Sequence, residues 1–395
     1  MTRMKRTLCI LIIIALLSAN AFAFKVVEDV ATKAGGYDIP IKVYIPEGQH
    51  QGNRPVMFHV HGGGWNGGDE KQVPPASVPA DCGLLCDRLG VIYVGLAYRC
   101  KGNAGTFHLA LKDLQASIEW FAERAKKFNA DMSRIGFGGG SAGTTLSAVL
   151  AQRYPNAKVY VGSEGMYNVL DLNPELSHFP SEKARADFGL LTREQKLEAS
   201  PFHQVRKKPA SALLLHGKDD WLCHYTQSVK YGEQLRKAGG KCKVVLYDGI
   251  NHTCRAIGYP KVFENSMMAI AKLYADGYGL ENVDFSAIEK KLDQMTAPHY
   301  PYEKIPVDKL PGKWKSGRFG TFIFKEDGTG TYVAPRGEQK KAFTYEPKGA
   351  YVAVSVEGES RERQIHMRKS NRDIYELITA DTRNKSRRHG YGKIE

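Results

Sequence analysis

The sequence has no C-x-x-C pair, no repeat of solenoid period and no low-complexity tract. The first absence disfavours a zinc site of the finger type, and the second excludes a solenoid. Long apolar runs are missing too, because the run Leu8–Leu17 has ten residues, whereas a membrane-spanning helix needs about 20. We therefore expect no integral membrane segment once a leader is removed, and no metal site of the finger type.

The N-terminus has the features of a secretory signal. Arg3, Lys5 and Arg6 precede the apolar run, and Ala21-Phe22-Ala23 follows it as an A-x-A cleavage site. We expect cleavage after Ala23 and a protein that is secreted or periplasmic.

Export changes the interpretation of the cysteines. Of the seven, Cys9 lies in the predicted signal, and six remain: Cys82, Cys86, Cys100, Cys223, Cys242 and Cys254. An even number in an oxidising compartment predicts disulfides, each worth about 2–4 kcal/mol, although six cysteines leave the connectivity open.

Basic residues outnumber acidic ones, with 56 Lys and Arg against 42 Asp and Glu and a net charge of +14. Residues 301–395 alone hold 20 basic and 13 acidic residues. Outside the cytoplasm, such a surface favours contact with anionic polysaccharide or a cell surface, and a merely solvated basic face explains it equally well. The predicted signal disfavours nucleic acid as a partner.

Short β-branched or apolar runs alternate with helical patterns from Val26 to about Tyr278. The expected strands are 41–46, 55–62, 90–99, 133–139, 158–165, 212–217 and 242–249. This alternation predicts a doubly wound, mostly parallel α/β sheet with its functional residues at the carboxyl ends of the strands.

A Pro-rich stretch without periodicity, residues 298–311, follows a possible last helix at 284–295 and is expected to be a linker. Beyond it, short strands at regular spacing predict a small antiparallel meander or barrel at 312–395. The segment GKWKSGRFGTFIFKEDGTGTY is similar to the opening of lipocalin-like β domains. The expected order is a signal at 1–23, an α/β domain at 24–297, the linker and an accessory β domain.

The stretch GGGSAG, residues 138–143, satisfies two motifs. Gly138, Gly140 and Gly143 spell the G-x-G-x-x-G of a dinucleotide site, with Glu164 as the acid about 20 residues on. Read as G-x-S-x-G, the same stretch places Ser141 on a nucleophile elbow. A dinucleotide motif belongs in the first βα unit, whereas this one follows the fourth expected strand, so we favour the elbow.

A nucleophilic serine needs a general base, and the base needs a carboxylate that orients it. Asp219 and Asp220 follow the expected strand 212–217, and His252 follows the strand 242–249. The order serine, acid, histidine is that of the α/β-hydrolase fold. Spacing alone leaves the choice between the two aspartates open.

Donors for the oxyanion are expected upstream, in the motif HGGGW at 61–65. Its glycines directly follow an apolar strand, where their backbone can turn N–H groups into the site. Gly63 and Gly64, together with the amide of Ala142, make a three-donor oxyanion hole. His59 and His61 alternate on the same strand without a third ligand nearby, so we expect no metal there.

With these motifs in place, residues 24–278 resemble the HGGGW esterase/lipase group of the α/β-hydrolase superfamily, which includes hormone-sensitive lipase and bacterial feruloyl and acetylxylan esterases. The shared motifs are HGGGW, DMSRIGFGGGSAG, HGKDDWL and DGINHT. The resemblance implies Ser141 as nucleophile, His252 as base, Asp220 as acid, and no cofactor or metal. Two tryptophans are candidates for the substrate pocket. Trp65 either lines the acyl pocket or simply packs, and Trp221, beside the acid, departs from the family pattern and would reshape the pocket rim.

Together these expectations predict a secreted serine esterase. Its expected substrate is a carbohydrate ester, from which it removes acetyl or feruloyl groups. A lipase or short-chain carboxylesterase, a prolyl-oligopeptidase-like peptidase, and a binding or adhesion protein that uses its β domain are the alternatives. A Cys223–Cys254 disulfide would tie the acid loop to the histidine loop and preorganise the site.

Overall fold

The computed structural model describes most of the chain after the first 23 residues. The described residues are 24–48, 52–79, 82–172, 182–220, 222–248, 250–252, 254–255, 259–296, 307–316, 320–334, 339–348, 352–359, 363–369, 375–380 and 388–393. The predicted signal therefore lies outside them, as does most of the predicted linker.

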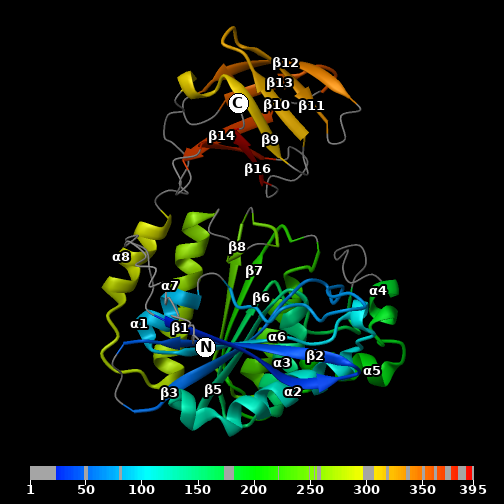
Figure 1. Ribbon diagram of the computed structural model, residues 1–395, viewed down its shortest axis with the longest axis vertical. Helices are drawn as coiled ribbons and strands as arrows, with labels where there is room; N and C mark the ends of the chain where they lie inside the picture. Colours follow the sequence, from blue (N-terminus) through cyan, green and yellow to red (C-terminus); the bar gives the residue numbers. More distant parts are fainter. Residues whose placement is uncertain are drawn as a thin grey trace, which may run out of the picture.

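Eight strands form one sheet in the order β1-β2-β4-β3-β5-β6-β7-β8 (Figure 1). They are β1 (Phe24–Ala34), β2 (Tyr37–Pro46), β3 (Arg54–Val60), β4 (Ile92–Leu96), β5 (Ala130–Gly140), β6 (Ala157–Ser163), β7 (Ser211–Gly217) and β8 (Cys242–Tyr247). Strands β3 to β8 pair in parallel, whereas β1 and β2 form an antiparallel hairpin at the β4 edge. The parallel part gathers the carboxyl ends of β5, β6, β7 and β8 at one edge.

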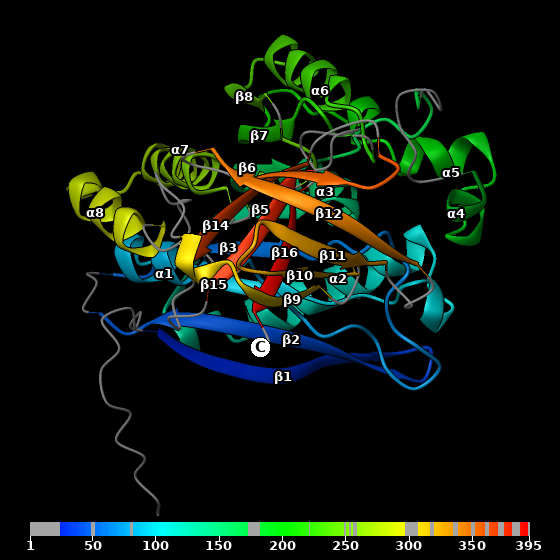
Figure 2. The ribbon, with the colours of Figure 1, turned by 90° about the horizontal axis from the view of Figure 1, so that it is seen from above.

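Helices cover both faces of the sheet (Figure 2). They are α1 (Cys82–Leu89), α2 (Phe107–Glu123), α3 (Ala142–Arg153), α4 (Glu182–Asp187), α5 (Arg193–Glu198), α6 (Thr226–Lys237), α7 (Pro260–Tyr278) and α8 (Phe285–Thr296). Short 3-10 turns lie at Lys101–Asn103, Ala125–Phe128, Pro201–His203 and Val307–Lys309. One hydrophobic core joins the sheet to α2, α3 and α6, and a second joins it to α1, α7 and α8.

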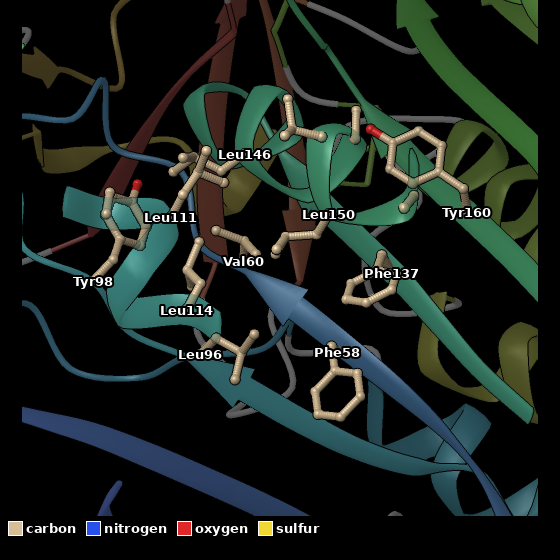
Figure 3. Packing of buried hydrophobic residues seen from close by; sticks show 14 of the residues in the cluster. Phe58, Val60, Leu96, Tyr98, Leu111, Leu114, Phe137, Leu146, Leu150 and Tyr160 are labelled. Atoms are coloured by element: carbon tan, nitrogen blue, oxygen red, sulfur yellow. The ribbon is translucent and has the colours of Figure 1, made fainter. Parts of the chain in front are cut away.

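Strand and helix periodicity explain why these two cores form. Neighbouring residues of β3 point to opposite faces, so that Phe58 packs in the first core and Met57 in the second. Leu111 and Leu114 are buried on one side of α2 (Figure 3), whose first turn is capped by the Thr106 hydroxyl accepting from the amide of Leu109. The predicted doubly wound α/β sheet is confirmed.

The C-terminal strands close into a barrel in the order β10-β11-β12-β13-β14-β15-β16-β9. They are β9 (Gly312–Ser316), β10 (Gly320–Phe324), β11 (Thr329–Val333), β12 (Lys340–Pro347), β13 (Val352–Val356), β14 (Arg363–Lys369), β15 (Tyr375–Ala380) and β16 (Arg388–Lys393). All their pairings are antiparallel, and β9 closes the barrel by pairing with both β10 and β16. Closure removes the exposed edges of an open meander.

The barrel has a hydrophobic core of its own. Trp314 is fully buried at its centre and donates its indole N–H to the carbonyl of Leu310, 2.8 Å away. Phe322, Phe324 and Phe343 pack against one another with ring centroids 5.1–5.9 Å apart. Figure 1 shows the barrel beyond the sheet, on the side where α7 begins and α8 ends.

Some strands differ from the expectations. Residues 24–34 were not expected to be a strand, and neither were the first and last barrel strands, β9 and β16. These three segments gain their strand character from pairing partners, because β1 pairs along its length with β2 and β9 pairs with β16 across the barrel closure.

No helix within the described residues has both the length and the apolar character that a membrane crossing requires.

Candidate functional site

Ser141 lies on a sharp turn between β5 and α3. Its backbone has φ 52° and ψ −125°, a conformation that is uncommon for a residue with a side chain. Its N–H donates to the carbonyl of Ser163 at the end of β6, 2.9 Å away. This turn has the strain and the strand-to-helix position expected of a nucleophile elbow.

Two glycines of the elbow lie where a side chain does not fit. A Cβ on Gly139 would be 2.6 Å from the carbonyl oxygen of Gly143, and a Cβ on Gly143 would collide with the carbonyl oxygens of Val60 and His61. Both glycines are thus required by close backbone packing around Ser141. The spacing G-x-S-x-G, rather than G-x-G-x-x-G, is the one that the structure uses.

The HGGGW loop packs directly against this elbow. A Cβ on Gly62 would lie 2.8 Å from the carbonyl oxygen of Gly140 and 3.2 Å from the Cβ of Ser141. Gly63 and Gly64 have φ of 107° and 65°, values that glycine adopts readily. The loop therefore passes next to the serine at Gly62, and the predicted donors Gly63 and Gly64 follow it directly.

Trp65 fixes the loop to the start of α3. Its indole N–H donates to the carbonyl of Ala142 at 3.1 Å, and its ring stacks on Phe188 with centroids 5.0 Å apart. The amide of Ala142 belongs to the first turn of α3, where helix N–H groups have no partner within the helix. With Trp65 only 1% exposed, its predicted place at the substrate pocket stays a prediction, and the indole has little surface to offer a substrate.

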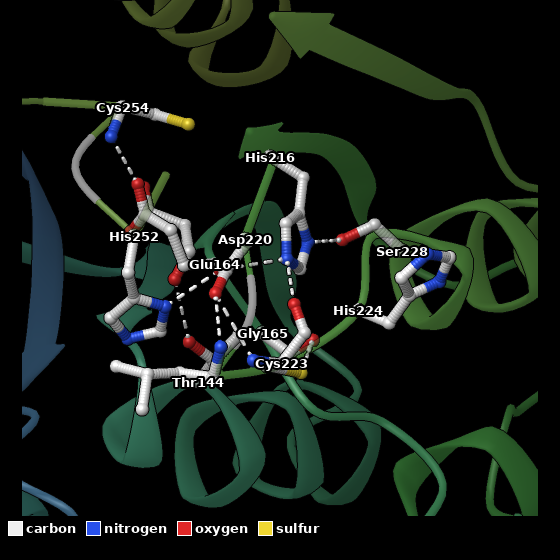
Figure 4. A network of polar contacts seen from close by, with 12 residues as sticks. Thr144, Glu164, Gly165, His216, Asp220, Cys223, His224, Ser228, His252 and Cys254 are labelled. Carbon is white, nitrogen blue, oxygen red and sulfur yellow. Dashed lines mark hydrogen bonds and ion pairs between the residues drawn. The ribbon is translucent and has the colours of Figure 1, made fainter. Parts of the chain in front are cut away.

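Asp220 and His252 meet at the ends of β7 and β8 (Figure 4). The imidazole Nδ1 lies 2.7 Å from Asp220 Oδ2, and the other carboxylate oxygen accepts the amides of Leu222 and Cys223 at 2.9 and 3.1 Å. Since a carboxylate accepts, Nδ1 carries the proton. His252 Nε2 is buried and has no hydrogen-bond partner among the described residues, which leaves it available as a base.

The structure also separates the two aspartates between which spacing alone did not choose. Asp220 is 2% exposed and contacts the histidine, whereas Asp219 is exposed and donates its backbone N–H to the carbonyl of Ile250, 3.0 Å away. Trp221, predicted to border the pocket, lies outside the described residues.

A second histidine holds the buried carboxylate from the other side. His216 Nε2 lies 3.1 Å from Asp220 Oδ2 and 2.8 Å from the carbonyl of Cys223, and its Nδ1 lies 2.7 Å from the hydroxyl of Ser228. Because both neighbours of Nε2 only accept, this nitrogen carries a proton. His216 was not among the predicted site residues, although its position at the end of β7, four residues before Asp220, was a usable signal.

This network sets the charges of the site. Burial by itself raises the pKa of Asp220, but hydrogen bonds from His216 and His252 hold the pKa well below its usual range. Burial lowers the pKa of His252, and the hydrogen bond to Asp220 and the charges of Asp220 and Glu164 outweigh it, so that the net shift is upward. The site therefore contains an ionised Asp220 next to His252, which can take up and release a proton.

The cysteines differ from the prediction. Cys223 and Cys254 are free buried thiols, as are Cys86 and Cys100, and Cys242 is a free thiol that is partly buried. The Sγ of Cys223 lies 3.1 Å from the carbonyl of Gly165 rather than near a second sulfur, and burial raises the pKa of this thiol. The predicted Cys223–Cys254 disulfide is therefore wrong for this structure: parity and compartment do not place two Cβ atoms within bridging distance.

The comparisons with known proteins agree with this geometry. Residues 41–235, which include the HGGGW loop, Ser141 and Asp220, match the BD-FAE family model. These residues are therefore similar to that family, and the sheet part of the chain has the α/β-hydrolase fold. Est2, an esterase from Thermogutta terrifontis, covers the α/β-hydrolase part with a TM-score of 0.53 at 19% identity, over 65% of this chain and 94% of its own, a likeness of fold.

Two relatives resemble the α/β-hydrolase part in sequence. The arylacetamide deacetylase of Oryctolagus cuniculus is 28% identical over 169 residues, which are 40% of this chain and 39% of the deacetylase. Carboxylesterase NlhH of Mycobacterium tuberculosis is 36% identical over 116 residues, 29% of this chain and 34% of the relative. The chain thus matches about two fifths or less of the length of these relatives.

Proposed function

We propose that this protein is a secreted serine carboxylester hydrolase with Ser141 as nucleophile, His252 as general base and Asp220 as the acid that orients the base. One observation carries the proposal: Asp220 and His252 are bonded at 2.7 Å at the same sheet edge as the strained turn of Ser141. The esterase names of its relatives support the same class of reaction.

In the proposed reaction, Ser141 Oγ attacks the ester carbonyl while His252 Nε2 takes the hydroxyl proton. The N–H groups of Gly63, Gly64 and Ala142 stabilise the oxyanion that forms. His252 then gives its proton to the leaving alcohol, which departs and leaves an acyl group on Ser141. Water activated by the same histidine hydrolyses this acyl-enzyme and restores the serine.

We further propose a carbohydrate ester as substrate, carrying an acetyl or feruloyl group. The name of the deacetylase relative supports the acetyl group. The described helices between β6 and β7 are short, since α4 and α5 have six residues each, which supports an open site more than a large lid. The basic C-terminal barrel is proposed as the part that contacts anionic polysaccharide or a cell surface.

A panel of esters tests this proposal. Acetylated and feruloylated oligosaccharides are compared with acetyl, butyryl and palmitoyl esters of one chromogenic alcohol and with a chromogenic peptide, with Ser141→Ala as the control. We expect turnover of the short acyl and carbohydrate esters by the wild type and none by the variant. Preference for the palmitoyl ester indicates a lipase, cleavage of peptides alone indicates a peptidase, and no turnover by folded protein contradicts the enzyme altogether.

A further inference from the structure

Glu164 follows β6 directly, between the strand of Ser141 and the strand that leads to Asp220. Its N–H donates to the carbonyl of Leu215 in β7, 2.9 Å away, and the residue before it accepts the amide of Ser141. From the sequence, this glutamate was considered only as the ribose ligand of a dinucleotide site. That role was rejected together with the dinucleotide motif. Its position at the candidate site gives it another use.

The conformation and burial of Glu164 are both unfavourable on their own. Its φ is 51°, in the left-handed region where side chains are disfavoured, and the residue is 8% exposed. A buried carboxylate is stable only when it is paired or hydrogen-bonded. Here the backbone N–H of Cys254 donates to Glu164 Oε1 (Figure 4).

Cys254 is the second residue after His252, so this hydrogen bond holds the loop that carries the base. The carbonyl of Cys254 accepts from the hydroxyl of Ser266 in α7 at 3.0 Å, which fixes the same residue from its other side. On the opposite side of His252, the carbonyl of Ile250 accepts from the amide of Asp219 at 3.0 Å. The base therefore lies in a loop anchored before and after it.

Two negative charges face His252. Asp220 bonds Nδ1, and Glu164 acts at longer range from the end of β6; both favour the protonated imidazole and oppose the effect of burial. The thiols of Cys223 and Cys254 lie near the same carboxylates and are neutral, because burial raises their pKa.

We infer that Glu164 is a positioning residue for His252, which anchors the base loop through the amide of Cys254 and adds a second, more distant negative charge that acts on the imidazole. This inference rests on the proposed function. It gives the buried glutamate a role in holding the base loop and in favouring the protonated form of His252.

Two variants separate the anchor from the charge. Glu164→Gln keeps an oxygen that accepts the Cys254 amide and removes the charge, so that the acid limb of the kcat/KM profile moves to lower pH, by about half a unit. Glu164→Ala removes both, and we expect kcat to fall about tenfold in addition, with KM changed less than about threefold. Glu264→Gln, a buried carboxylate in α7 that accepts from Thr296, is the matched control and leaves the profile unchanged.

Proton NMR titration of His252, assigned with a His252→Gln variant, measures the charge without any substrate. A lower imidazole pKa in Glu164→Gln than in the wild type supports the inference. An unchanged titration together with wild-type kcat in Glu164→Ala overturns it while the proposed function stands. A wild type that hydrolyses no ester contradicts the proposed function instead, and the titration still decides whether Glu164 acts on His252.

Discussion

The carboxyl edge of the sheet and the interior of the barrel bury very different side chains. At the sheet edge, Asp220, His216, Ser228 and Glu164 are all buried and joined to partners by hydrogen bonds. In the described part of the barrel, every fully buried side chain is hydrophobic. The ion pair of Arg363 with Glu359 lies nearer the surface, where both side chains are partly exposed.

This difference in buried side chains indicates that the two regions have different functions. Buried polar groups are unfavourable unless each finds a partner, so a connected set of them at one place indicates that the fold serves chemistry there. A core of packed aromatic rings stabilises a fold and presents its outer surface to partners. We accordingly expect changes at the sheet edge to alter catalysis, and changes in the barrel core to alter stability alone.

Among variants at the sheet edge and in the barrel, Asp220→Asn is expected to have the largest effect, a loss of kcat. The amide keeps the volume but no longer fixes the proton of His252 on Nδ1, and kcat should fall by about 10³- to 10⁴-fold. Turnover of a short acyl ester measures it. The matched control is Asp219→Asn, the exposed neighbour, and a loss of similar size there would contradict the assignment of the acid.

Trp314→Ala tests whether the barrel core contributes to stability alone. Removing a fully buried indole should lower the free energy of unfolding of the barrel by about 3–5 kcal/mol. Urea unfolding followed by circular dichroism measures this loss, and the two regions are expected to unfold in separate transitions. If kcat on a short ester falls as well, the barrel core is not independent of the site.

A smaller catalytic effect is expected from His216→Ala. The variant removes the second donor to Asp220 and leaves the bond to His252, so that kcat should fall about tenfold. Ser228→Ala is the matched control, because it removes only the outer partner of His216 and should have less effect. Equal kcat for His216→Ala and wild type would show that the second histidine only fills space.

Deletion of residues 298–395 should have the smallest effect on a soluble ester. We expect kcat and KM on a short acyl ester to stay within about twofold, since the site is built from the sheet part. Binding to, and hydrolysis of, an insoluble polysaccharide ester should fall. Unchanged activity on the insoluble ester would remove the proposed targeting role of the barrel.

The order of motifs along the chain predicted much of the fold and of the site. Strand alternation gave the parallel sheet, and the placement of Ser141 and His252 at strand ends followed from it, because parallel strands bring their carboxyl ends together. Short-range periodicity carried less information about β1, β9 and β16, whose strand character depends on partners distant in the sequence.

The rest of the site required three-dimensional information. Asp219 and Asp220 are adjacent in sequence, and spacing does not choose between them. The resemblance predicted Asp220, and the path of the loop after β7 explains why this aspartate is the one bonded to His252. The bond between Glu164 and Cys254 joins residues 90 positions apart. No spacing rule predicts such a pair. Cysteine parity likewise left the connectivity open, and Cys223 and Cys254, paired in the prediction because they flank the two catalytic loops, are free thiols in the structure.

Fluorophosphonate labelling tests the central claim most directly. The probe reacts with a serine only where a base activates it, so labelling requires the assembled group rather than any one residue. We predict one labelled site, Ser141, in the wild type and no label in a Ser141→Ala variant whose circular dichroism matches the wild type. Folded wild type without label, or equal labelling of both proteins, would contradict the account.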